Sequence, residues 1–523
     1  MNAILILYAG NLSKTAFEPL FDGKNSVELA IEQAQKFPGA GKIVILTDKK
    51  NDFSFLHEKI ERIEPQSAAA WTKRSLLEKI AELQGSFDLI YFAFADCPFL
   101  DPALAGAIAD RQIRYKAEYS YADGWPFGLA PETLSPGTAG ILAKISGEDG
   151  SVERDILFSV IQKDINAFDI ETEISSVDLS CHRLNLQSDS KRNFLLLKKF
   201  ISANNEIIPA AADIEKIIAE QPEVLRTLPA FYPIQVYGGC PQSCSICPYP
   251  AYTDAANRKD FMSAENFEAL LDKITAFSGD AVIDLSLWGE LSLHPDRIKL
   301  IESVLKRKEL PLIIETSGIG WKNEELEQIK NYNEQLTKNN EQSRENLLPA
   351  ISWIVSLDTS NSQQYMKIRG NGFAEAEACA KKLLSLFPND CYVQAVRFKG
   401  SEEDTEKFYR YWKENAPNGE KNIIIQKYDH FCGLLEKKQA SDLSPIIRHG
   451  CWHIMRDMPV LIDGTVPLCR EYLPALKGDK TYTLGNVFSD SLESIWKNGE
   501  CYYKEETPCG LCADCDEYYT YNF

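Results

Sequence analysis

Three cysteines, Cys240, Cys244 and Cys247, lie within eight residues of one another in a C-x3-C-x2-C pattern. The loop between them is too short and too bent for these thiols to pair easily as disulfides. They can instead converge on one metal centre, since a compact loop can turn each sulfur inward. The rest of the fold must therefore hold three thiols in one place.

Three thiolates leave one iron of a [4Fe–4S] cube without a protein ligand. A small molecule can bind that iron and receive an electron. A zinc loop is the alternative, but zinc normally takes four ligands from two C-x2-C pairs. The next cysteine is Cys379, far along the chain. The pattern therefore favours an iron–sulfur cluster.

Composition indicates a globular protein, since 44% of the 523 residues are hydrophobic and 25% are charged. This length predicts about two to four domains. The net charge of −20 argues against non-specific binding to nucleic acid or to an anionic membrane. Residues 1–10 lack a basic leader, and no apolar run reaches the roughly 18 residues of a membrane span. We therefore expect a cytoplasmic protein with no nucleic-acid or membrane partner.

Apolar strands alternate with helices over residues 1–220, which predicts a doubly wound α/β domain with a parallel sheet. The expected strands are 3–10, 42–47 and 87–94, and the expected helices are 26–37 and 71–83. In such sheets ligands bind at the carboxyl ends of strands. Gly10 and Asp96 stand at these ends.

This first domain resembles nucleotidyltransferases of the cytidylyltransferase type, through the Ala9-Gly10 turn and the run Ala-Asp-Cys-Pro-Phe-Leu that contains Asp96. The resemblance implies that Asp96 holds Mg²⁺ against nucleotide phosphates. The glycine-rich turn of this family is reduced here, however, because Asn11 follows Gly10. Asn166 stands near the position where a second metal-binding carboxylate is expected. We expect that the fold persists and that transfer activity is lost. A structural aspartate at a strand end is the alternative.

Residues 225–435 predict a complete or partial β/α barrel with polar residues at the carboxyl ends of its strands. The expected strands are 231–237, 281–287, 311–316, 351–358 and 392–397. The polar or glycine positions at their ends are Gly289, Glu290, Thr316, Ser356, Asp358 and Arg397.

Together with the cysteine loop, this region resembles the radical SAM superfamily. The resemblance implies that Cys240, Cys244 and Cys247 carry a catalytic [4Fe–4S] cluster. S-adenosylmethionine (SAM) is then cleaved reductively to a radical that abstracts hydrogen. It further implies cofactor contacts for Ile246 (adenine), Gly289 and Glu290 (ammonium), Ser356 and Asp358 (ribose), and Arg397 (carboxylate). Thr316 matches the cofactor-binding turn after the third strand.

Residues 440–523 contain a second group of cysteines. Cys451 and Cys469 flank an Asp-Gly hairpin signal within 459–468, and Cys509, Cys512 and Cys515 follow near the end. This region resembles the SPASM/Twitch extension of radical SAM enzymes, and the whole arrangement resembles the spirochete spiro-SPASM family. The resemblance implies one auxiliary [4Fe–4S] cluster on Cys451, Cys469, Cys512 and Cys515, with Cys509 as a spare. Structural zinc is the alternative.

These features predict a radical SAM enzyme that abstracts hydrogen from an unknown small molecule or peptide. The outcome would be dehydrogenation or modification, and an electron donor such as flavodoxin or ferredoxin would reduce the cluster. Two alternatives remain. One is cytidylyltransferase-type nucleotidyl transfer at the first domain, and the other is a non-catalytic iron–sulfur or zinc protein.

Overall fold

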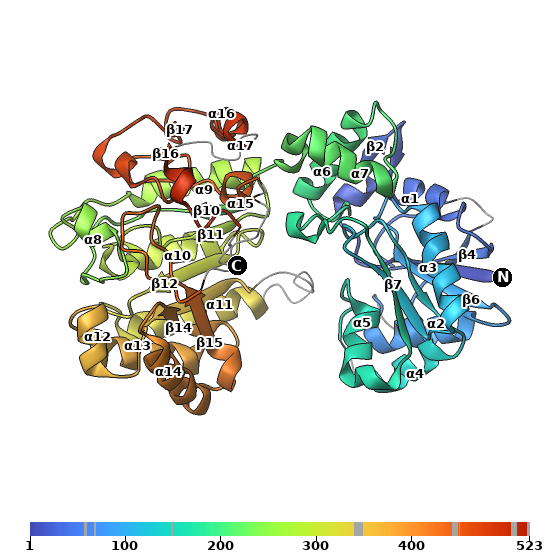
Figure 1. The fold of residues 1–523 in the computed structure, drawn as a ribbon, viewed down its shortest axis with the longest axis horizontal. Coiled ribbons are helices and arrows are strands. Elements are labelled where there is room, and N and C mark those ends of the chain that lie inside the picture. Colours follow the sequence, from blue (N-terminus) through green and yellow to red (C-terminus); the bar gives the residue numbers. More distant parts are fainter. Residues whose placement is uncertain are drawn as a thin grey trace. The chain divides into compact units, whose positions relative to one another are not determined.

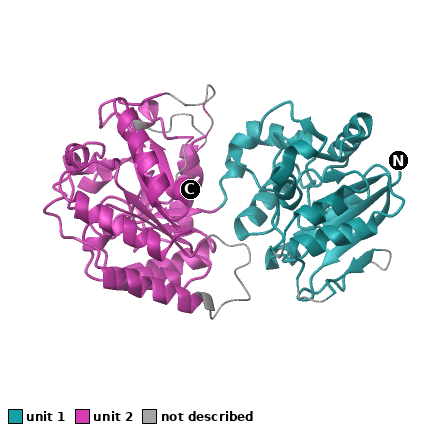
Figure 2. Ribbon diagram, turned by 90° about the horizontal axis from the view of Figure 1, so that it is seen from below, with its two compact units in different colours: residues 1–227 teal, residues 228–523 magenta. Residues whose placement is uncertain are grey.

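The computed structural model describes residues 1–56, 60–66, 70–147, 150–338, 349–441, 448, 450–503 and 510–519. The chain forms two compact units, residues 1–227 and 228–523 (Figure 2). The cysteine-rich C-terminal region belongs to the same unit as the predicted barrel. None of the described helices combines the length and apolar character needed to cross a membrane.

In its described part, the first unit contains a seven-stranded sheet in the order β5-β4-β1-β6-β8-β7-β9 (Figure 1). All seven residues of the central strand β1 (Ala3–Ala9) are buried, as its continuous apolar run predicts. The other strands of this unit are β2 (Pro19–Phe21), β3 (Lys24–Asn25), β4 (Ala40–Thr47), β5 (Glu61–Ile63), β6 (Leu89–Phe94), β7 (Tyr119–Asp123), β8 (Glu132–Leu134) and β9 (Ile170–Ile174). Its helices are α1 (Ser26–Ala34), α2 (Lys73–Leu83), α3 (Pro102–Tyr115), α4 (Thr138–Ile145), α5 (Ile156–Ile161), α6 (Lys191–Ala203) and α7 (Ala211–Glu220).

One strand differs from the predicted parallel arrangement. Strand β8 pairs antiparallel with both of its neighbours, β6 and β7, so the sheet is mixed. The short connection from β7 to β8 explains this direction, because a parallel pairing would need a longer crossover.

Asp96 lies just beyond the end of β6, where the Mg²⁺ ligand was expected. Its side chain is fully buried, and both carboxylate oxygens accept hydrogen bonds from the Arg154 guanidinium at 2.7 Å. Arg154 also lies over the Phe94 ring, at 4.7 Å from its centroid. The structure thus gives Asp96 an arginine as its partner, and its predicted Mg²⁺ role stays a prediction.

Replacement of Arg154 by Met would leave a buried carboxylate without a counter-charge. We expect the stability of the first unit to fall by about 3 kcal/mol, the lower end of the usual range, because the Arg154 side chain is 35% exposed. Hydrogen exchange of the β6 amides measures this loss. The double variant Asp96→Asn/Arg154→Met should recover much of it, and equal exchange in the single and double variants would contradict the prediction.

The described part of the second unit contains a six-stranded sheet in sequence order, β10 to β15, with every neighbouring pair parallel (Figure 1). This is the predicted partial barrel. Its strands are β10 (Phe231–Pro233), β11 (Val282–Asp284), β12 (Leu312–Thr316), β13 (Ile351–Ser356), β14 (Cys391–Arg397) and β15 (Ile423–Lys427). The helices up to β15 are α8 (Tyr249–Tyr252), α9 (Ala264–Phe277), α10 (Arg297–Leu305), α11 (Asn323–Lys338), α12 (Ser362–Ile368), α13 (Phe373–Leu386) and α14 (Glu402–Asn415).

The C-terminal segment is built on the edge of this barrel. Met458 N donates to Phe231 O at 2.9 Å and Val460 N donates to Pro233 O at 2.8 Å, so residues 457–460 lie along β10. The later elements are α15 (Trp452–Arg456), β16 (Thr465–Pro467), β17 (Thr483–Asn486), α16 (Leu492–Asn498) and α17 (Glu500–Tyr503).

The predicted hairpin within 459–468 is therefore only partly correct. Its turn forms at Gly464, whose φ is +83°, but β16 pairs antiparallel with β17 and not with the preceding segment. The first arm pairs with β10 instead, because an edge strand offers free backbone groups to any segment that reaches it.

Candidate active site

Cys240, Cys244 and Cys247 lie on the loop after β10, and all three line a cavity of about 260 Å³ in the second unit. The loop is anchored to helix α12, because Ser245 N donates to Ile368 O at 2.8 Å. Gln242 Nε2 adds a hydrogen bond to the Tyr365 hydroxyl at 2.7 Å. The three thiols thus converge, as their spacing predicts.

The chemistry of these thiols fits a cluster with one open iron. Burial raises the pKa of Cys240 and of Cys247 to about 12, and it also raises that of Cys244. Bound metal must therefore displace their protons and supply positive charge. Among the described residues, no fourth cysteine lines the cavity. This donor set suits a three-thiolate [4Fe–4S] cluster better than a four-ligand zinc site.

Arg369 supplies a fixed positive charge beside the loop. It lines the cavity, and its charge acts to lower the pKa of all three thiols. Arg369 Nε donates to Asp358 Oδ2 at 2.5 Å, and both side chains are buried. The sequence pattern did not single out Arg369, because it follows helix α12 and not a strand end.

Asp358 does not line the cavity, although Ser356 on the same segment does. Its Oδ1 atom accepts a hydrogen bond from Val396 N at 2.8 Å, and its Oδ2 atom is taken by Arg369. Asp358 thus positions Arg369, and its predicted contact with the SAM ribose stays a prediction.

Arg397 is exposed at the end of β14 and faces away from this cavity. It lines a separate depression with Lys427 and Gln439. Gln394 lines the main cavity, and residues three apart on a strand point to opposite faces. The predicted contact of Arg397 with the SAM carboxylate stays a prediction, and strand alternation places this side chain on the face opposite Gln394.

Gly289 is required by the backbone of the cysteine loop. Its φ is +133°, and a Cβ at this position would lie 1.9 Å from Tyr237 O. The next amide, Glu290 N, donates to Gly239 O at 2.9 Å. The close approach that demands glycine is therefore made by the loop itself.

Glu290 links the ends of β11 and β12. Its carboxylate accepts hydrogen bonds from Thr316 Oγ1 at 2.7 Å and from Ser317 N at 2.8 Å. Gly289, Glu290, Thr316, Ser356 and Ile246 all line the same cavity. Their individual roles toward SAM stay predictions.

Three further carboxylates on the cavity wall, Asp284, Glu315 and Asp429, were not predicted. Burial raises the pKa of Asp284 to about 7. Glu315 Oε1 accepts hydrogen bonds from Ser356 Oγ at 2.6 Å and from Gln394 Nε2 at 2.8 Å. Asp284 and Glu315 lie on the apolar strands β11 and β12, where a charged residue was a usable sequence signal.

The structure also brings C-terminal thiols together. Burial raises the pKa of Cys451 to about 12, and the Cys515 and Cys469 thiols lie close enough to act on one another and on Cys451. Cys432, which no motif includes, joins this group, because its thiol lies close enough to interact electrostatically with those of Cys515 and Cys469.

The other cysteines of the auxiliary region differ in placement. Cys512 is buried, and its carbonyl oxygen accepts a hydrogen bond from Cys515 N at 3.3 Å. Cys501 is exposed, with its thiol 3.7 Å from Asn498 O. Cys509 lies outside the described residues. The predicted ligand roles of Cys512 and Cys509 therefore stay predictions.

Comparison with known proteins agrees with this geometry. Residues 234–411 match the radical SAM superfamily, and residues 451–516 match the SPASM iron–sulfur cluster-binding domain. An uncharacterized protein of Treponema pallidum (strain Nichols) is 35% identical over 379 residues, which is 70% of this chain and 98% of that protein.

Two solved structures are similar at low identity. A cytidylyltransferase from Leptospira borgpetersenii serovar Hardjo-bovis is 16% identical, with a TM-score of 0.36, over 43% of this chain and 96% of that chain. Streptococcus suis SuiB bound to its precursor peptide SuiA is 16% identical, with a TM-score of 0.39, over 65% of this chain and 78% of that chain.

The thiol loop, the parallel barrel and the second thiol group define an iron–sulfur enzyme. The chain belongs to the radical SAM superfamily and carries a SPASM domain. This confirms the predicted fold class, the enzyme class, and the [4Fe–4S], SAM and auxiliary iron–sulfur cofactors.

Replacement of Gly289 by Ala should displace the cysteine loop, since the new Cβ would overlap Tyr237 O. We expect iron bound after anaerobic reconstitution to fall to about the amount held by the auxiliary centre alone. Gly279→Ala is the matched control. Gly279 also has positive φ, at +83°, but no atom lies within 4 Å of the new Cβ. The Gly279→Ala variant should lose about 1 kcal/mol of folding stability and keep its iron content unchanged. Equal iron in both variants would contradict the prediction.

Proposed function

We propose that this enzyme abstracts a hydrogen atom from a hydroxyl- or amine-bearing substrate. The substrate radical then passes one electron to the auxiliary cluster and releases its hydroxyl or amine proton, which completes the dehydrogenation. When bound, the Cys240/Cys244/Cys247 cluster and SAM supply the 5′-deoxyadenosyl radical. The residues of this chain hold the cluster, orient the substrate and exclude water. The observation that carries the proposal is the set of charges on the cavity wall.

The cations on this wall are already paired. Among the described residues lining the cavity, these cations are Arg369, Lys427 and Arg470, and their carboxylate partners are Asp358, Glu517 and Glu471, respectively. Each pairing neutralises a charge that could otherwise hold an anionic substrate. An acidic substrate is therefore disfavoured.

Carboxylate oxygens on the same wall keep capacity for hydrogen bonds. Asp429 Oδ2 has no hydrogen-bond partner among the described residues. Asp284 Oδ1 accepts one hydrogen bond, from Ser286 N at 2.9 Å. Burial raises the pKa of both groups, so each carboxyl can accept a hydrogen bond through a free oxygen and can also carry a proton, and hydroxyl and amine groups complement both states. This supports dehydrogenation of an alcohol or amine over modification of an acidic group.

Nucleotidyl transfer is not proposed. The Arg154 guanidinium binds both oxygens of Asp96, the carboxylate on which a transfer site would depend. In the second unit, the buried three-thiol loop supports radical chemistry over a purely structural metal site.

Replacement of Cys240, Cys244 and Cys247 together by Ala should abolish 5′-deoxyadenosine formation from SAM under reducing conditions, because no ligand for the first cluster remains. Liquid chromatography of the products measures this loss. Cys379→Ala is the control, since Cys379 is buried on helix α13 and does not line the cavity. Undiminished product from the triple variant would refute the proposal.

The pH dependence should reflect Asp284. Its pKa is about 7, so its carboxylate is ionised above that pH and protonated below it. We expect substrate-dependent 5′-deoxyadenosine formation, assayed with a fractionated metabolite extract, to rise between about pH 6 and pH 8. Asp284→Asn should flatten this rise. Substrate-free SAM cleavage over the same range is the control, and an unchanged profile in the variant would count against Asp284 as a substrate contact.

A further inference from the structure

Cys432 lies on a tight turn, residues 429–433, that follows strand β15. Phe431 and Cys432 both adopt left-handed backbone conformations, with φ of +51° and +53°. For residues other than glycine this costs about 1 kcal/mol or more each, so surrounding contacts must hold the turn. Phe431 N donates to Asp429 Oδ1 at 2.6 Å, and Gly433 N donates to His430 Nδ1 at 2.8 Å. The turn is thus fixed with Cys432 at its centre.

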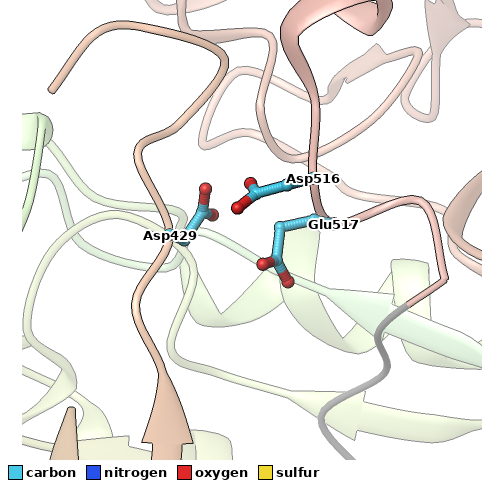
Figure 3. A group of neighbouring side chains, drawn as sticks. All are labelled: Asp429, Asp516 and Glu517. Atoms are coloured by element: carbon cyan, nitrogen blue, oxygen red, sulfur yellow. The ribbon is translucent and has the colours of Figure 1, made fainter. Parts of the chain in front are cut away.

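The segment that carries this turn is fastened to the segment around Cys515. Lys427 Nζ donates to Asp516 O at 2.7 Å and to the Glu517 carboxylate at 2.5 Å. In Figure 3 the carboxylates of Asp429, Asp516 and Glu517 gather at this junction. Lys427 already supplies a cation here, so we do not assign a metal ion to these carboxylates.

Contacts on either side of the two cysteines set their positions. His430 Nε2 lies 3.6 Å from Asp516 Oδ1, and Lys437 Nζ lies 3.1 Å from Asp514 Oδ1. Cys432 therefore lies in the chain between His430 and Lys437, and these two residues contact Asp516 and Asp514, one on each side of Cys515. Glu517 N in turn donates to the Cys515 sulfur at 3.4 Å.

The thiols of Cys432, Cys451, Cys469 and Cys515 form one compact group. The contacts of His430 and Lys437 bring residue 432 to the segment around Cys515, and Trp452 N donates to Tyr518 O at 2.8 Å, which places Cys451 beside the same segment. Cys515 and Cys469 each act electrostatically on two or more of the other thiols. Four converging thiols are the donor set that a fully ligated [4Fe–4S] cluster requires.

We infer that Cys432 is an iron ligand of the auxiliary cluster, together with Cys451, Cys469 and Cys515. The neighbouring residue Phe431 lines the same cavity as Cys240, Cys244 and Cys247, and the centroid of its ring lies 5.7 Å from that of Trp288. The proposed ligand Cys432 therefore directly follows a residue of the cavity wall. This position suits a cluster that accepts an electron from the cavity. The assignment does not depend on the substrate proposed above.

The test uses full-length protein in which Cys240, Cys244 and Cys247 are replaced by Ala, so that only the auxiliary centre binds iron. Adding Cys432→Ala should remove at least about one of the four irons of this cluster and change the electron paramagnetic resonance spectrum of the reduced protein. Adding Cys469→Ala instead should have the same two effects. Cys501→Ala is the exposed control, and it should change neither. Cys512→Ala should retain the cluster. Full iron and an unchanged spectrum in Cys432→Ala, with loss in Cys512→Ala, would overturn the inference.

A second measurement needs no variant at position 432. In the reconstituted parent protein, Cys432 should resist alkylation by iodoacetamide and become reactive after chelation of iron, as peptide mass spectrometry would show. Cys501 should be labelled in both states. Equal labelling of Cys432 before and after chelation, or a Cys432–Cys515 disulfide in the iron-loaded protein, would overturn the inference. Both readouts report on the metal centre, so they are independent of whether a substrate turns over.

Discussion

The ion pair between Arg369 and Asp358 is the interaction on which the cysteine loop depends. Three thiols sit in a partly buried loop where desolvation opposes their ionisation. Burial also works against the charge of Arg369, but the Asp358 carboxylate outweighs it and keeps the arginine cationic. Arg369 lowers the pKa of all three thiols, and its partner Asp358 offsets part of that effect at Cys244. Asp358 itself holds a left-handed backbone, with φ of +65°, so the chain accepts local strain to place this pair.

The region from Lys427 to Gly433 connects the two metal centres of the second unit. It begins at the end of β15, contributes Lys427, Asp429 and Phe431 to the cavity wall, and carries Cys432 to the auxiliary thiols. The C-terminal segment in turn pairs with β10 at the other edge of the sheet. The auxiliary region is therefore held from two sides of one compact unit.

The first unit has a mixed seven-stranded sheet in its described part, and its predicted metal ligand is paired with an arginine of the same unit. Arg154 reaches Asp96 with two parallel hydrogen bonds, the geometry in which a guanidinium matches a carboxylate best. A buried aspartate of this kind supports the end of β6.

Patterns of neighbouring residues were enough to predict the alternating elements of both units, the barrel and the three-thiol loop. Apolar runs and the C-x3-C-x2-C spacing involve only residues that are close in the sequence, so the sequence alone reveals them. The antiparallel β8, the pairing of 457–460 with β10, and the placement of Arg369, Asp358 and Arg397 were not predictable in this way. Each depends on which distant groups share one buried space. Cys432 is the clearest case of a residue whose neighbours come from a distant part of the chain. It belongs to no motif, and only the folding of residues 427–437 onto 514–517 brings its sulfur to the other thiols.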